Sequence, residues 1–306
     1  MMNRIVIALG GNAISAGDPS AAGQEAACLQ SVKQLKPLLE NNEAVLTHGN
    51  GPQVGALLLQ QAAGNTAKTP AMPLATVGAM SQGSIGYWLE QASQSAQLAK
   101  PAVCLVTPTL VDRNDPAFQK PTKPIGPFYK KEQVAEQQRL HPEAVYREDA
   151  GRGWRQVVAS PKPLKIMNTD LIDLLLRHGS VPIVAGGGGI PVVQDDAGLH
   201  GVAAVIDKDW GAALLARTLQ ADRLIILTAV DHAFINFGQK DQKALERVSA
   251  QQMTQYLAAG QFAAGSMAPK VAACLDFVKH TGHEATIAAL SDAGRVEQGA
   301  GTTIYA

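Results

Sequence analysis

The chain has 306 residues, a hydrophobic fraction of 46% and 26 basic against 26 acidic side chains. That length suits one large α/β domain or two modest lobes, and zero net charge favours neither a nucleic acid nor a membrane surface as partner. Three scattered cysteines lack disulfide or zinc spacing, and no apolar run approaches the ~20 residues of a membrane span. We therefore expect a cytoplasmic protein.

Short apolar runs alternate with helical periodicity along most of the chain, which is typical of βαβ units and a parallel sheet. The predicted strands cover residues 4–9, 44–46, 102–107, 181–185, 223–228, 285–289 and 302–305. The predicted helices cover residues 22–40, 50–62, 74–98, 168–177, 210–220 and 266–278, the third being interrupted near Gly83 and Gly86.

Residues 108–163 break this alternation. They hold eight of the seventeen prolines, many charges and little clean periodicity. We therefore expect an inserted, protruding lobe rather than sheet, with one short strand over residues 155–158.

Three glycine-rich turns follow predicted strands and contain no lysine: Gly10-Gly11-Asn12, Gly49-Asn50-Gly51 and Gly186 to Gly189. Backbone N–H groups gathered at the carboxyl ends of parallel strands can hold a polyphosphate. The alternative is that the glycines only make tight turns. Four consecutive glycines are entropically costly, so we favour a close approach of the backbone to a ligand. Neither a P-loop nor a GxGxxG fingerprint occurs.

Two lysines lie near predicted helix starts. In Asp207-Lys208-Asp209 an aspartate can cap the helix, or Lys208 can be an ammonium held for a phosphoryl group; the spacing favours the cap. Lys270 falls in the first turn after Ser266, a predicted N-cap. A cation is unfavourable there unless an anion lies between it and the helix, which indicates a ligand.

Taken together, these segments resemble the carbamate kinases of the amino-acid kinase family. The likeness runs nearly end to end, through residues 8–13, 47–55, 82–89, 114–118, 121–129, 148–153, 160–163, 206–209 and 265–267. It implies one domain over residues 1–306, folded as a three-layer αβα sandwich around a mainly parallel sheet, with a small protruding subdomain near residues 108–163 and a homodimer. It also implies reversible phosphoryl transfer between carbamoyl phosphate and ADP, with Mg²⁺ accompanying ATP or ADP and no metal bound by the protein itself.

The resemblance also implies roles for single residues. Lys123 and Lys208 would flank the transferred phosphoryl group, and Asp209 would orient the lysines. The residues on the carbamoyl phosphate side would be Gly10, Gly11, Asn12, Asn50 and Gly51. Those on the nucleotide side would be Lys270, Ala229, Met267 and, as a second-tier candidate, Asp231. The first strand has Ile7-Ala8-Leu9 where many members of the superfamily carry a lysine, and Lys123 would replace that lysine.

Carbamate attacks as an oxyanion and needs no general base, so His48 is interpreted as orienting its loop. The resemblance is compatible with ATP synthesis in arginine or allantoin catabolism. Two alternatives remain. A kinase of this fold acting on another small carboxylate or phosphate is disfavoured by the missing first-strand lysine. A weak or inactive paralogue serving as a nucleotide-binding regulatory protein is disfavoured by the three retained lysines and Asp209.

Overall fold

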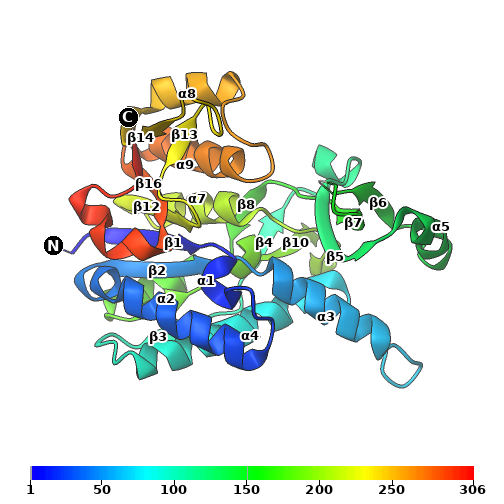
Figure 1. The fold of residues 1–306 in the computed structure, drawn as a ribbon. Helices are drawn as coiled ribbons and strands as arrows, with labels where there is room; N and C mark the ends of the chain where they lie inside the picture. The colour runs from blue at the N-terminus through cyan, green and yellow to red at the C-terminus, as the bar shows by residue number, and fades with distance from the viewer. Residues whose placement is uncertain (1, 150) are drawn as a thin grey trace.

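An eight-stranded sheet runs through the middle of the computed structural model, which describes residues 2–149 and 151–306 (Figure 1). In spatial order its strands are β15 (Arg247–Ser249), β17 (Thr302–Tyr305), β16 (Glu284–Ala289), β12 (Arg223–Thr228), β1 (Arg4–Leu9), β2 (Glu43–His48), β9 (Val181–Ile183) and β3 (Ala102–Cys104). Every neighbouring pair is parallel except β16 with β17. The predicted mainly parallel sheet is confirmed.

Both faces of this sheet are buried under helices. Val6 and Ala8 of β1 belong to one core, while Ile5, Ile7 and Leu9 belong to a second core on the opposite face, as the alternation of a strand requires. The first core contains residues of α6 (Thr169–Arg177), α7 (Lys208–Thr218), α8 (Ala250–Ala258) and α9 (Met267–Thr281); the second contains residues of α1 (Asn12–Ser15), α2 (Ala21–Asn41), α4 (Leu74–Ser95) and η3 (Leu290–Gln298). The expected three-layer sandwich is therefore confirmed.

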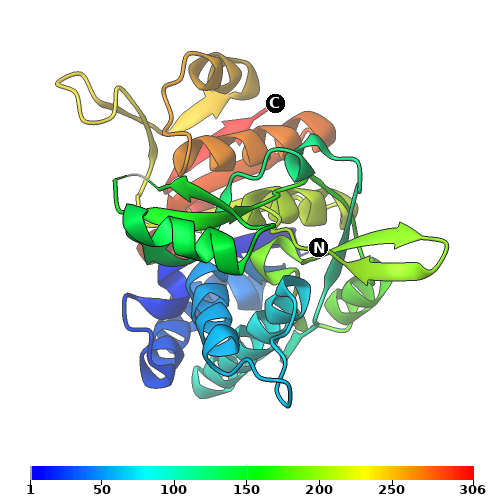
Figure 2. The same ribbon diagram turned by 90° about the vertical axis from the view of Figure 1, so that its right-hand side faces the viewer.

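Besides a short hairpin of β13 (Ala233–Ile235) and β14 (Lys243–Leu245), two larger sheets accompany the sandwich in the described residues. One has the order β11 (Gly198–Gly201), β10 (Ile190–Asp195), β4 (Pro108–Val111) and β8 (Pro163–Ile166); its β10–β11 hairpin projects to the right in Figure 2. The other is antiparallel, with the order β5 (Lys123–Tyr129), β7 (Trp154–Val158) and β6 (Val145–Glu148). Together with α5 (Lys131–Leu140) it forms the lobe at the right of Figure 1.

The expectation that residues 108–163 would not form sheet is wrong. Pro124 and Pro127 lie in β5, which is an edge strand, and a proline is tolerated at an edge because its missing N–H leaves no ladder bond broken. The ladder between β5 and β7 is irregular between Ile125 and Tyr129. Dense proline therefore marks an edge strand here.

Several predicted boundaries change. Helix α4 runs unbroken through Gly83 and Gly86, and a Cβ at Gly86 would overlap the Cys104 Sγ atom, so this glycine lets the helix approach β3. The remaining elements are α3 (Gly51–Ala63), η1 (Pro116–Phe118) and η2 (Gly186–Gly188). Among the helices of residues 2–149 and 151–306, none combines the length and apolar character needed to cross a bilayer.

Candidate active site

A cavity of about 280 Å³ lies between the lobe and the starts of α3, α7 and α9. The predicted site residues that line it are Gly11, Asn50, Gly51, Lys123, Lys208, Asp209 and Lys270. Gly11 and Asn50 follow the carboxyl ends of β1 and β2, the edge at which open α/β sheets bind ligands. Residues from five separate stretches of the chain thus meet at one place.

Two of the lysines share one carboxylate. Asp209, which is 4% exposed, accepts hydrogen bonds from the Lys208 ammonium and, at 3.1 Å, from the Lys270 ammonium. Each lysine side chain is only 15% exposed. One buried carboxylate cannot neutralise two ammonium groups, so this corner of the cavity keeps a positive charge suited to an anion.

The third lysine has a carboxylate of its own. Lys123 Nζ lies 2.8 Å from Asp207 Oδ2. The other oxygen of Asp207 accepts the backbone N–H of Asp209 at 2.9 Å and caps α7. The predicted cap is therefore confirmed. Asp209 also holds the Lys208 ammonium, and the role of Lys208 toward a phosphoryl group stays a prediction. Burial acts to raise the pKa of Asp207, but Lys123, the Asp209 N–H and Lys208 outweigh it and leave that pKa lowered.

The anion beside the start of α9 is a side chain of the protein, the Asp209 carboxylate. The Asp209 carboxylate receives the Lys270 ammonium close to the positive end of this helix. This contact relieves the unfavourable placement of Lys270 that the sequence indicated. Ser266 is the N-cap residue, as predicted, although its side chain makes no capping hydrogen bond. Its carbonyl instead accepts a 3.4 Å contact from Lys270.

The four-glycine turn packs against the other site loops. All four glycines are buried, and Gly187, Gly188 and Gly189 have φ between 69° and 95°. A Cβ at Gly186 would overlap the His48 ring, and one at Gly187 would overlap the Asn50 side chain. Gly187 and Gly189 also line the cavity. The turn therefore forms part of the cavity wall and, by packing against His48 and Asn50, fixes the position of the loop of residues 49–51. Asn50 in turn donates to Ser81 Oγ at 2.9 Å.

His48 is fully buried behind the Gly49 turn. Its Nδ1 lies 2.9 Å from the Gly49 carbonyl, which can only accept, so Nδ1 carries the proton. Burial lowers the pKa of His48 to about 4; the nearby Lys208 acts in the same direction, and the Gly49 hydrogen bond opposes them. A neutral, buried imidazole fits the expected loop-orienting role.

Two adjoining cavities extend the site. One of about 280 Å³ is largely apolar and is lined by Ala229, His232, Phe234, Phe237, Phe262, Met267 and Lys270. The other, about 460 Å³, is lined by residues that include Gly10, Gly11, Lys208, Ala229 and Lys270. Because Lys270 borders all three cavities and Lys208 borders two, the lysines stand where the cavities meet.

Among the predicted residues whose side chains the structure describes, Asp231 is not brought to these cavities. Its carboxylate is 58% exposed and lies 3.3 Å from the His232 ring. The side chain of Asn12 lies outside the described part of the structure, although its backbone begins α1. Sequence reasoning missed Phe262 and the pairing of Asp207 with Lys123. The only signal for that pairing was the cap position of Asp207.

The likeness to known proteins is strong and covers almost the whole chain. A model of the amino acid kinase family matches residues 3–289. The carbamate kinase of Lentilactobacillus hilgardii is 50% identical over 99% of this chain and 98% of its own. That of Oenococcus oeni is 49% identical over 99% of both.

Solved structures agree with these relatives. Carbamate kinase from Giardia lamblia bound to AMP-PNP has a TM-score of 0.91 at 42% identity, covering 99% of this chain and 98% of that one. N-acetylglutamate synthase from Neisseria gonorrhoeae, at 16% identity and a TM-score of 0.60, covers 99% of this chain and 59% of its own and shares the fold alone. The chain therefore belongs to the amino acid kinase family and, within it, to the carbamate kinases.

Proposed function

We propose that this chain catalyses reversible phosphoryl transfer between carbamoyl phosphate and ADP, giving ATP and carbamate, which decomposes to ammonia and CO₂. The observation that carries the proposal is the convergence of Lys123, Lys208 and Lys270, from three separate elements, on one cavity. The described residues that line this cavity supply two carboxylates to these three lysines. The local excess of positive charge suits a phosphoryl group flanked by other anionic groups.

The chemistry requires alignment and charge neutralisation. Phosphoryl transfer passes through a loose transition state with charge spread over the equatorial oxygens. Lys123 and Lys208 would contact these oxygens from two sides, while Asp209 holds Lys208 and Lys270 in place. Carbamate, or the ADP phosphate in the reverse direction, attacks already deprotonated. The neutral, buried His48 is therefore not needed as a base.

The substrates would divide between the cavities. The aromatic and thioether side chains of the apolar cavity suit a nucleobase, and Lys270 would guide the nucleotide phosphates toward the lysine cluster. Gly11, Asn50 and Gly51 would bind the carbamoyl phosphate side of the main cavity, with Gly10 at its border with the phosphate path.

Mg²⁺ would enter with ATP or ADP as part of the substrate. Across the residues that the structure describes, no group of three or more His, Cys, Asp or Glu side chains could hold a metal ion. The two carboxylates at the cavity, Asp207 and Asp209, already bind lysines. The residues present thus fit a metal held by the nucleotide phosphates.

The finer assignments extend the same proposal. Residues 108–163 would act as a subdomain that closes over the cavity, and the protein would work as a cytoplasmic homodimer in arginine or allantoin catabolism. Exposed apolar side chains on α4 (Met80, Tyr87) and α6 (Leu171, Leu174) supply surface for a second copy. Light scattering coupled to gel filtration tests the dimer.

The reaction is tested by incubating the protein with carbamoyl phosphate, ADP and Mg²⁺ and measuring ATP. We expect turnover, and we expect Lys208→Ala to lower kcat on the order of 10²–10³, about 3–4 kcal/mol of transition-state stabilisation. Lys279→Ala, which removes an exposed lysine from the last turn of α9, is the matched control. A loss of kcat below tenfold would mean that Lys208 only lies beside the Asp207 helix cap and takes no part in the transfer. Nucleotide binding without ATP formation would favour the regulatory paralogue.

A further inference from the structure

The Asp207 carboxylate joins two parts of the fold through its two oxygens. Oδ1 accepts the Asp209 N–H at 2.9 Å and so belongs to the start of α7. Oδ2 accepts the Lys123 ammonium at 2.8 Å and so reaches the lobe. Asp209 binds the other two lysines, Lys208 and Lys270. Two carboxylates on one helix start therefore fix the positions of all three lysines.

Lys123 lies where the lobe is attached to the rest of the protein. It is the first residue of β5 and pairs with Val158, the last residue of β7. The next hydrogen bond outward from the lobe runs from Thr122 N to Val158 O at 3.1 Å. The Lys123 side chain is 37% exposed, more than twice the 15% of Lys208 and Lys270. Of the three, its ammonium depends most on an ion pair to stay at the cavity.

We propose that Asp207 is a positioning residue for Lys123, an inference that rests on the proposed phosphoryl transfer. An ammonium group has three N–H donors, so one can stay on Asp207 while the others reach phosphoryl oxygens. Without the carboxylate, the flexible lysine must be ordered anew in each transition state. The entropy of a lysine side chain corresponds to a loss of about tenfold to thirtyfold in rate.

The test separates the charge of Asp207 from its capping role. Asn and Ser both retain an oxygen that can cap a helix, so Asp207→Asn and Asp207→Ser remove the charge and keep the cap acceptor. We expect both variants to melt close to the wild type and to bind ADP with unchanged affinity in calorimetry, because Asp207 does not line the two nucleotide-side cavities. Their kcat/KM for carbamoyl phosphate should fall about tenfold or more.

A double-mutant cycle with Lys123→Met identifies the partner through which Asp207 acts. If Asp207 works through Lys123, Asp207→Asn should change kcat/KM less than about twofold once Lys123 is gone. Asp112→Asn is the control, because it also removes a negative charge beside the lobe, where Asp112 is exposed and accepts the Asn114 N–H at 2.8 Å. Its activity should match the wild type.

Two results would overturn the inference: wild-type kinetics in Asp207→Asn and Asp207→Ser, or losses that multiply with that of Lys123→Met. Failure of the reaction itself looks different. Wild-type protein that forms no ATP would refute phosphoryl transfer before any variant is compared, whereas an active wild type with an unimpaired Asp207→Asn would refute the role of Asp207 alone.

Discussion

At this site some residues supply charge, and His48 instead fixes the geometry of a loop. The lysines carry charge, and Asp207 and Asp209 hold them. His48 carries no charge: it donates to the Gly49 carbonyl and packs against Gly186. Its burial next to the ammonium of Lys208 keeps its pKa near 4, which makes it a source of acid sensitivity in the folded protein.

The direction of that sensitivity follows from proton linkage. In the unfolded chain His48 binds a proton near pH 6.5, whereas in the folded chain it does so only near pH 4. The unfolded state binds more protons between these values, so stability is fully present above about pH 6.5 and is lost as the pH falls toward 4. The loss attributable to His48 reaches about 3 kcal/mol.

His48→Asn isolates this contribution, because an Asn side chain can still donate to Gly49 and does not titrate in this range. Urea unfolding at several pH values from about 7 to about 4.5 should show a shallower loss of stability in the variant than in the wild type. Parallel curves would contradict the assignment.

Among the elements, the four-glycine turn determines where the Asn50 loop lies. Gly187→Ala would have to adopt φ of 69° and would overlap Asn50, so we expect a loss of about 3 kcal/mol in stability and a higher KM for carbamoyl phosphate. Gly179→Ala is the control: its φ is 74°, but a Cβ there meets no atom within 4 Å. It should cost about 1 kcal/mol and leave KM unchanged. Equal effects of the two substitutions on KM would contradict the packing argument.

Elements with strong local signals could be predicted from the sequence. Strands β1, β12 and β17 have the predicted bounds because each is a dense apolar run. Helix α7 begins two residues early because Asp207 caps it. Of the lobe sheet only β7 was predicted, as residues 155–158. Strands β10, β11, β5 and β6 were missed, since their pairing depends on distant partners and short segments show little periodicity.

The candidate site shows the same limit. Glycine turns and lysines at helix starts have local signatures, and most of them line the cavity. The contact between Lys123 and Asp207 joins residues 84 positions apart, so no spacing rule reveals it. The aromatic side chain of Phe262 lies in a loop, where no periodicity shows which way it faces.

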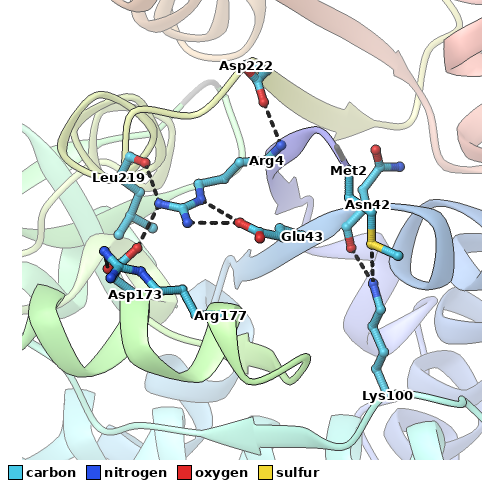
Figure 3. A network of polar contacts seen from close by, with 9 residues as sticks. All are labelled: Met2, Arg4, Asn42, Glu43, Lys100, Asp173, Arg177, Leu219 and Asp222. Carbon is cyan, nitrogen blue, oxygen red and sulfur yellow. Dashed lines mark hydrogen bonds and ion pairs between the residues drawn. The ribbon is translucent and has the colours of Figure 1, made fainter.

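At the scale of the whole molecule, the end of the sheet opposite the cavity is fastened by a polar network (Figure 3). Arg4, at the start of β1, binds Glu43 and Asp173 at 2.8 Å each and donates to the Leu219 carbonyl at 3.0 Å. These contacts join β1, β2, α6 and the end of α7. The network therefore holds together the layers on which the site rests without touching the cavity.

Arg4→Met would leave Glu43 and Asp173 half-buried without their shared cation. We expect a loss of about 2–3 kcal/mol in unfolding free energy with unchanged kcat and KM. Arg177→Met is the matched control, because Arg177 also binds Asp173 but is 70% exposed, and it should cost about 1 kcal/mol or less. A change in kinetics without a change in stability would contradict this separation.

The place of Lys123 within the lobe also determines how far its backbone would move if the lobe turned relative to the rest of the protein. A body turning about its attachment displaces each point in proportion to that point's distance from the axis. Lys123 is at the attached end of β5, and Phe128 is about 17 Å further along at strand spacing. A swing that displaces the outer end of β5 at Phe128 would carry the Lys123 backbone through only a short arc. The Lys123 ammonium would then stay almost in register with Asp207 while the outer part of the lobe changes position.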